Sequence, residues 1–153
     1  ERMTASMLSV KERLLSILPD IVRLEDFIED NEEEEEEEAI MTINELKECL
    51  DKIESLTTFV HKVNEWAESA QPKIDDEEQL AVHKEIIETA ELFLNRLEDL
   101  DIDVNIKKEA LAEEKKNLGN DEFKKGKYLV ALALYEEAIN INPTNAIYYT
   151  NRA

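Results

Sequence analysis

Two side chains that donate hydrogen bonds, Lys116 and Asn120, are spaced so that they could act together. Lys116 and Asn120 are four positions apart, so in a helix they lie on the same face. A lysine ammonium donates charge-assisted hydrogen bonds, and the NH2 of an asparagine amide donates directional ones. No Ser/His/Asp set, glycine-rich phosphate loop or Cys/His cluster accompanies the pair. We therefore expect a binding site rather than a catalytic one, with no metal and no cofactor.

The sequence around this pair resembles the tetratricopeptide repeat (TPR), a peptide-binding pair of antiparallel helices that stacks on its neighbours. Lys115 and Glu122 replace the Trp and the first Tyr of the repeat pattern W-x2-L-G-x2-Y…A-x3-F…P. The other fixed positions of that pattern are filled by Leu118, Gly119, Ala131, Tyr135 and Pro143.

Small and helix-ending residues predict how this repeat folds. Two antiparallel helices approach closely where the facing side chains are small, so we expect Gly119 and Ala131 at their contact. Gly126 fits a helix C-terminus that needs positive φ, and Pro143 cannot continue a helix interior. The predicted helices are residues 106–125 and 128–141, followed by the start of a second repeat at residues 145–153.

The residues beside the small positions narrow the resemblance to the carboxylate-clamp TPRs of the chaperone-organising co-chaperones. That family binds the acidic C-terminal EEVD tail of the seventy- and ninety-kilodalton heat-shock chaperones. The resemblance implies that Lys116, Asn120 and Asn151 hold the peptide, since Asn151 follows Asn120 at the spacing that the family shows. Two further cations of the family lie on a third repeat that this chain lacks. The clamp is therefore half built here, and we expect the chain alone to bind the tail weakly or not at all.

The incomplete second repeat predicts that residues 128–153 expose an apolar surface that another part of a protein must bury. About three repeats are usually needed for stability, and the chain begins with Glu1 rather than Met. We interpret it as a piece of a longer protein. Apolar side chains within residues 128–153 would lie in water unless another copy, another protein or the N-terminal part of the chain covers them. The first two options would make the chain a homo-oligomer or a complex subunit.

Charge divides the chain near residue 104. Residues 1–104 hold 10 Lys/Arg and 31 Asp/Glu, a net charge of −21, whereas residues 105–153 hold eight and seven, a net charge of +1. The acidic part argues against nucleic acid and anionic membrane surfaces as partners. We therefore predict two domains, an acidic helical region at residues 1–104 and a truncated TPR domain at residues 105–153.

Residues 1–104 have the pattern of three amphipathic helices. This predicts an all-α fold, either an antiparallel three-helix bundle or a coiled coil with a partner chain. Pro19 lies inside the first apolar stripe and should kink or split that helix, and Asp75 or Asp76 should cap the third helix. The stripes comprise Val10, Leu14, Ile17, Ile21, Leu24 and Ile28; then Ile43, Leu46, Leu50, Ile53, Leu56, Val60, Val63 and Ala67; then Leu80, His83, Ile87, Ala90, Leu94 and Leu97.

Two acidic motifs in this region are expected to be structural. The seven consecutive glutamates from Glu32 to Glu38 predict a solvated linker over residues 31–39. Residues 99–105 read D-L-D-I-D-V-N and resemble the start of a calcium loop. Val104 stands where that loop needs Gly and Ala110 where it needs Glu. We expect residues 99–105 to be a packed connector.

A single cysteine and the absence of a long apolar run bear on the compartment. Cys49 has no partner for an internal disulfide, which fits a reducing, cytoplasmic environment. No apolar run approaches the roughly 18 residues of a membrane span. We therefore expect a cytoplasmic protein that does not act at a membrane.

Two classes of function remain open at this point. The first is a co-chaperone adaptor, in which residues 1–104 bind a client or second partner and the TPR holds the chaperone tail. The second is a scaffold or assembly subunit, whose helices oligomerise and stack on other proteins. Neither class is an enzyme.

Overall fold

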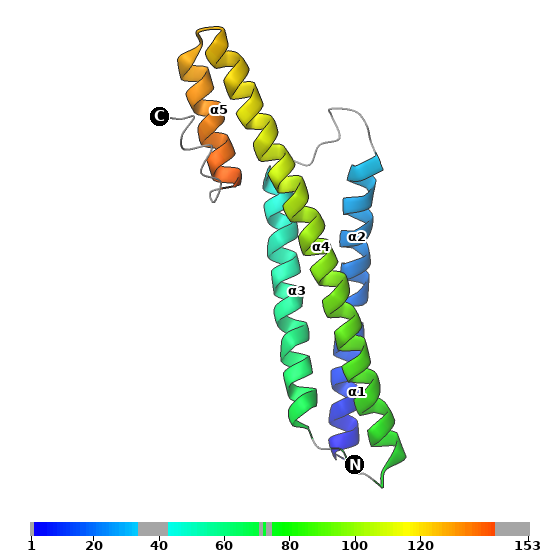
Figure 1. Cartoon of the computed structure of the whole chain (residues 1–153). Coiled ribbons are helices and arrows are strands. Elements are labelled where there is room, and N and C mark those ends of the chain that lie inside the picture. Colours follow the sequence, from blue (N-terminus) through cyan, green and yellow to red (C-terminus); the bar gives the residue numbers. More distant parts are fainter. Residues whose placement is uncertain (1, 34–42, 71, 73–74, 143–153) are drawn as a thin grey trace. The chain divides into compact units, whose positions relative to one another are not determined.

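The computed structural model describes residues 2–33, 43–70, 72 and 75–142, and within these ranges the chain forms helices and no strand (Figure 1). The all-α prediction is confirmed. The five helices are α1 (Arg2–Leu15), α2 (Leu18–Glu33), α3 (Ile43–Ser69), α4 (Glu77–Lys124) and α5 (Tyr128–Ile141). None of the described helices is long and apolar enough to cross a membrane.

The chain divides into two compact units, and α3 and α4 each contribute to both. The first unit is Glu1–Ile40 with Glu48–Ile102, and the second is Met41–Lys47 with Asp103–Ala153. The boundary therefore falls inside α4, between Ile102 and Asp103. Of the linker predicted at residues 31–39, the first part belongs to α2, which continues to Glu33, and the rest lies outside the described residues.

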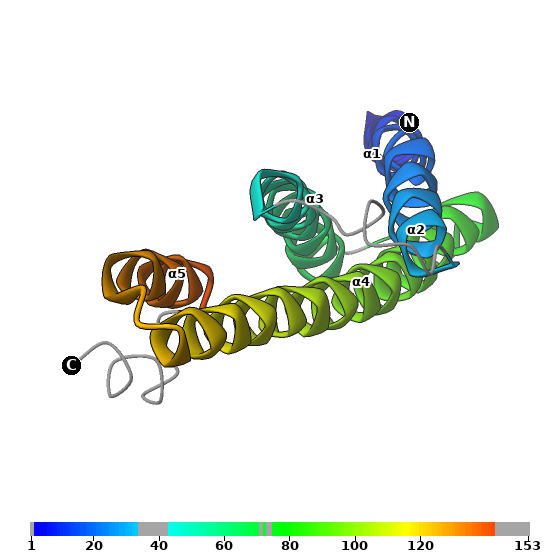
Figure 2. The same ribbon diagram turned by 90° about the horizontal axis from the view of Figure 1, so that it is seen from above.

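The first unit is a bundle in which α3 runs antiparallel to α2 and to the N-terminal part of α4 (Figures 1 and 2). Ion pairs join α1 to α4, α2 to α3 and α2 to α4. Lys11 Nζ lies 2.8 Å from Glu85 Oε2, Lys52 Nζ lies 3.7 Å from Asp20 Oδ1, and Arg96 pairs with Glu25. The net effect of its surroundings is to raise the pKa of the Arg96 guanidinium. The main cause is the hydrogen bond to Glu25. Partial burial opposes this shift, and the charge of the Glu25 carboxylate adds to it.

The helix boundaries follow from local sequence signals. α1 ends at Leu15 and α2 begins at Leu18, so Pro19 lies in the first turn of α2, where its missing N–H is not needed. The predicted split at Pro19 is confirmed. The predicted cap of the third helix is also confirmed, because Asp76 Oδ1 accepts a hydrogen bond from the backbone N–H of Gln79, 3.1 Å away.

The core of the bundle agrees with two of the three predicted stripes. In α1, α2 and α3 most of the expected positions are buried, including Ile21 and Val60, and Cys49 joins them. In α4 the stripe is displaced, since Leu80 is exposed and His83, Ile87 and Leu94 are only half-buried. The buried positions of α4 in this unit are Gln79, Val82, Ile86, Ala90, Phe93, Leu97 and Leu100.

The prediction of a connector between the two domains is wrong. Residues 99–105 are an uninterrupted part of α4, so the third bundle helix and the first TPR helix are one helix of 48 residues. No Gly or Pro occurs between Glu77 and Leu118 to end it. The apolar stripe also continues through this segment, with Leu97, Leu100 and Val104 buried. Helical geometry turns alternating acidic side chains in different directions and therefore excludes a calcium loop there.

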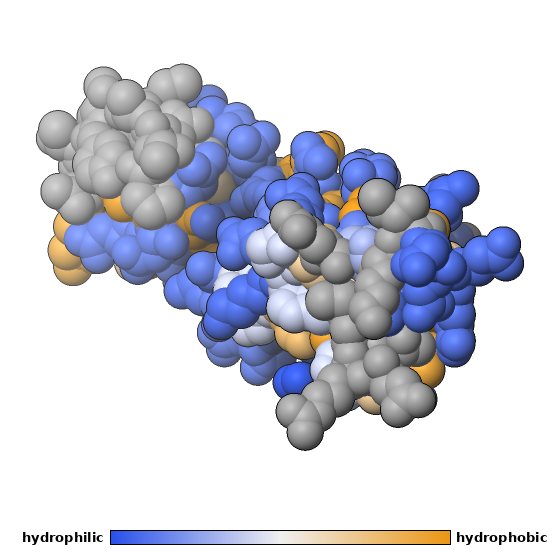
Figure 3. Space-filling model, turned by 90° about the horizontal axis from the view of Figure 1, so that it is seen from below, coloured by the Kyte–Doolittle hydropathy of each residue, from blue (hydrophilic) through white to orange (hydrophobic). Residues whose placement is uncertain are grey.

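The outer surface reflects the composition. The face shown in Figure 3 is mostly hydrophilic, and hydrophobic side chains appear on it in small, separate areas. This agrees with a chain in which 37% of the residues are charged.

Candidate peptide-binding face on the helix pair

The helix pair of the second unit is formed by the C-terminal part of α4 and by α5, which lie side by side (Figures 1 and 2). The turn between them is a Schellman motif. The N–H of Lys127 donates to the carbonyl of Glu122 at 2.9 Å, and the N–H of Gly126 donates to that of Phe123 at 3.0 Å. Gly126 has φ +82°, so the predicted positive φ is confirmed. α5 begins and ends at the predicted residues.

Small residues allow the two helices to approach, as the sequence predicts. Ala131 on α5 is buried. A Cβ atom at Gly119 would lie 2.6 Å from Cε1 and 2.8 Å from Cδ1 of Tyr135. Because real Cβ atoms do not approach so closely, glycine at position 119 is what admits the aromatic ring.

Lys116 and Asn120 lie one turn apart on α4. They therefore share one face of this helix, as predicted from their spacing. Both residues are half-buried. The hydroxyl of Tyr135 donates a hydrogen bond to Asn120 Oδ1 at 2.6 Å. No described residue accepts a hydrogen bond from Asn120 Nδ2. The amide oxygen is therefore engaged within the helix pair, and the NH2 group remains able to donate.

The ammonium of Lys116 has one carboxylate partner within the chain. Its Nζ lies 2.5 Å from Glu113 Oε1, on the preceding turn of α4, and the lysine side chain is 16% exposed. Neighbouring Lys115 joins the two helices through Glu137 at 3.3 Å. An ammonium can donate three hydrogen bonds. A second carboxylate can therefore bind to Lys116, in competition with Glu113.

Two members of this arrangement were not predicted from the sequence. Glu113 precedes Lys116 by three positions, a spacing at which helical ion pairs form, so a local signal existed. Tyr135 is 15 positions from Asn120, and its spacing gave no such signal. The third predicted site residue, Asn151, lies outside the described residues, as do Pro143 and the start of the second repeat.

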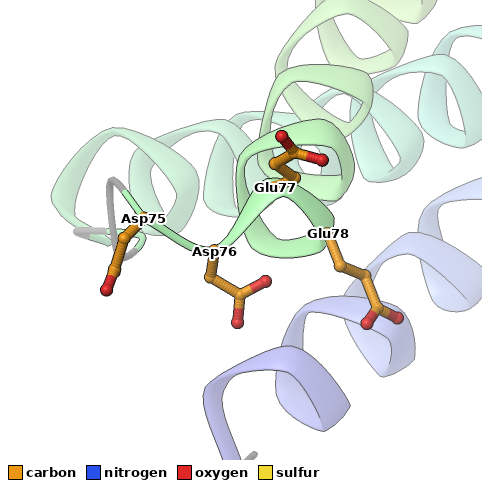
Figure 4. Close-up of a pocket in the computed structure, with 4 residues that line it drawn as sticks. All are labelled: Asp75, Asp76, Glu77 and Glu78. Atoms are coloured by element: carbon orange, nitrogen blue, oxygen red, sulfur yellow. The ribbon is translucent and has the colours of Figure 1, made fainter.

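A separate acidic cluster at the start of α4 does not form a metal site. Figure 4 shows Asp75, Asp76, Glu77 and Glu78 with their carboxylates pointing in different directions. Asp76 is engaged as the helix cap. Over the described ranges no group of three or more His, Cys, Asp or Glu side chains could hold a metal ion.

Comparison with known proteins finds relatives for the C-terminal part of the chain. The family described as TPR repeat matches residues 119–153. Stress-induced-phosphoprotein 1 of Caenorhabditis elegans is 56% identical over 43 residues, which are 28% of this chain and 13% of that protein. Hsp70-Hsp90 organizing protein 3 of Arabidopsis thaliana is 49% identical over 43 residues, 28% of this chain and 8% of that protein. Human serine/threonine-protein phosphatase 5 is 52% identical over 42 residues, 28% and 8% of the two chains.

These matches confirm the resemblance to TPR proteins that include co-chaperones, over about 28% of the chain. They support a TPR-type protein–protein interaction module at the C-terminal end. The chain spans 13% or less of the length of these relatives. The match to a phosphatase therefore gives no indication of catalytic activity in this segment. No solved structure gives a significant match to the chain.

Proposed function

We propose that the helix pair is the first part of a carboxylate clamp, which binds the acidic C-terminal EEVD tail of a heat-shock chaperone through Lys116, Asn120 and Asn151. The observation that carries the proposal is the arrangement of Asn120, whose oxygen is bonded to Tyr135 and whose NH2 is left to donate one turn from the Lys116 ammonium. A free carboxylate accepts both kinds of hydrogen bond. The printed names of relatives, Hsp70-Hsp90 organizing protein among them, support a chaperone as the partner.

The N-terminal region completes this proposal. Residues 1–104 would form an acidic helical region that binds a client or a second partner, while the TPR holds the chaperone tail. The protein would then act as a non-enzymatic adaptor in the cytoplasm, and its net charge of −21 over residues 1–104 would disfavour nucleic acids there.

Nuclear magnetic resonance titration of the chain with a peptide ending in EEVD tests the clamp. We expect weak binding, with a Kd on the order of 1 mM (about −4 kcal/mol), and shifts at Lys116 and Asn120. Lys116→Ala should lower the affinity, since a hydrogen bond to a charged group contributes about 1.5–3 kcal/mol. Glu113→Gln should raise the affinity by releasing Lys116, by about threefold if the partly exposed ion pair contributes roughly 0.5–1 kcal/mol.

Lys125 provides a matched control. It also pairs with a glutamate three positions earlier, Glu122 at 3.4 Å, but its position nine residues after Lys116 places it on the opposite side of the helix axis. Lys125→Ala should leave the affinity unchanged, and a peptide with an amidated C-terminus should bind more weakly than the free acid. Equal effects of Lys116→Ala and Lys125→Ala would contradict the clamp.

A second candidate function is an assembly or scaffold subunit, and one observation favours it. α5 presents apolar side chains to water at the start of the helix, where Tyr128 is 63%, Leu129 84% and Val130 48% exposed. Contiguous exposed apolar patches mark interaction surfaces. This candidate differs from the first because the apolar residues, rather than Lys116 and Asn120, would carry the interaction.

Light scattering over a concentration series tests the second candidate. If the patch on α5 holds two copies together, the chain should be a dimer or larger oligomer, and Leu129→Glu should convert it to a monomer by placing a charge in the contact. Leu92→Glu on α4 is a suitable control, because Leu92 is also exposed, at 54%, but lies in the first unit. A monomer at all concentrations would contradict self-assembly through this patch.

A further inference from the structure

The side chain of Tyr135 is held in place on both sides. Tyr135 is only 5% exposed. One edge of the ring lies so close to Gly119 that a Cβ there would come within 2.6 Å of Cε1. Its hydroxyl lies 2.6 Å from Asn120 Oδ1, the next residue of α4. The ring therefore cannot move without breaking either the helix contact or the hydrogen bond.

The orientation of the Asn120 amide decides whether it can bind an anion. An asparagine side chain offers an acceptor oxygen on one side and a donor NH2 on the other. The NH2 attracts a carboxylate, whereas the amide oxygen repels it. A rotation of the amide by half a turn would exchange these two groups.

The hydroxyl of Tyr135 favours one of the two orientations. With Oδ1 toward Tyr135, the buried hydroxyl proton has an acceptor, and no other described residue is bonded to that hydroxyl. With Nδ2 toward Tyr135, the hydroxyl could only accept from Asn120, and its own proton would lose this acceptor in a residue that is 5% exposed, which is costly. The bond to Oδ1 leaves Nδ2 as the group available to a ligand.

We propose that Tyr135 is a positioning residue, which fixes the amide of Asn120 with its donor group available and so makes this face selective for a free carboxylate. Gly119 takes part indirectly, because it admits the ring that carries the hydroxyl. The proposal rests on the proposed function, since it assumes that Asn120 contacts the carboxylate. It adds a specificity-determining hydroxyl that makes no contact with the ligand itself.

Tyr135→Phe removes the hydroxyl and keeps the ring, so the packing against Gly119 is retained. We expect the affinity for the EEVD free-acid peptide to fall by about fivefold, the value of one hydrogen bond, and the preference for free acid over amidated peptide to shrink. In an Asn120→Ala background the same substitution should have no effect. The side-chain NH2 resonances of Asn120 should move or broaden in Tyr135→Phe without peptide. Tyr128→Phe is the control, because Tyr128 is 63% exposed.

The outcomes separate this proposal from the function on which it rests. If Asn120→Ala weakens binding but Tyr135→Phe does not, or if Tyr135→Phe weakens it equally in the Asn120→Ala background, the positioning role is overturned and the clamp stands. Unchanged NH2 resonances of Asn120 in Tyr135→Phe would also overturn the positioning role. If neither Lys116→Ala nor Asn120→Ala changes the affinity, the clamp itself is overturned and the selectivity for a carboxylate with it.

Discussion

Replacing Leu97 with alanine is expected to destabilise the helical bundle by about 2–5 kcal/mol, the cost of truncating a buried leucine. Leu97 is 1% exposed and is among the largest fully buried side chains of the described residues. The substitution removes its transfer free energy and leaves a cavity that the long helix α4 can close only in part. Because small domains are stable by only about 5–15 kcal/mol, this loss is a large fraction of the total.

The measurement is urea unfolding followed by the fluorescence of Trp66, which is the only tryptophan and lies on α3 in the same unit. Leu92→Ala is the control, since it makes the same change on the same helix at a residue that is 54% exposed. We expect its effect to stay within about 0.5 kcal/mol. Equal losses for the two variants would show that α4 buries a different face from the one described.

The all-helical character of the chain could be predicted from the sequence because apolar periodicity is local information. Pro19 predicted a kink or a break, which lies between α1 and α2, and Asp75 or Asp76 was the expected cap of α4, a role that Asp76 has. The buried residues of α4 differ from the predicted apolar stripe for a physical reason. Apolar residues occur there at adjacent positions, such as Ile86 with Ile87 and Phe93 with Leu94, so two stripes one residue apart fit the same period.

The sequence predicts a connector at residues 99–105, where the structure has the uninterrupted helix α4. The alternation of aspartates over residues 99–105 suggested a connector, but no helix-breaking residue stands there and the buried row continues through Leu100 to Val104. An exposed aspartate costs a helix only a few tenths of a kcal/mol, about 0.7 at most. Burial of the apolar row outweighs that cost.

Some features of the candidate site could be predicted from local spacing in the sequence, and others depend on how the helices pack. Spacing placed Lys116 and Asn120 on one face, and the repeat pattern placed Gly119 at the helix contact. The hydrogen bond between Tyr135 and Asn120 depends on how α5 lies against α4, which spacing along one helix does not encode. The competition of Glu113 for Lys116 was accessible from spacing but needs the burial of the lysine side chain to become significant.

Gly119→Leu is expected to destabilise the helix pair by about 2–4 kcal/mol, although leucine is the better helix former by roughly 0.8 kcal/mol. Its Cβ alone would lie 2.6 Å from the ring of Tyr135, and the rest of the side chain would have to displace that ring from a buried position. The hydrogen bond to Asn120 would be lost with it. Hydrogen exchange of the α5 amides measures this loss in the second unit, where no tryptophan reports.

Asn117→Leu is the matched control for Gly119→Leu, because it adds the same side chain to α4 at an exposed residue. Exchange in α5 should be close to that of the unaltered chain. Adding Tyr135→Ala to Gly119→Leu should cost less than the sum of the two single losses, by about 1–3 kcal/mol, since each change makes room for the other. Strict additivity of the two substitutions would mean that the ring of Tyr135 does not occupy the space beside Gly119, and the basis for orienting Asn120 would be removed.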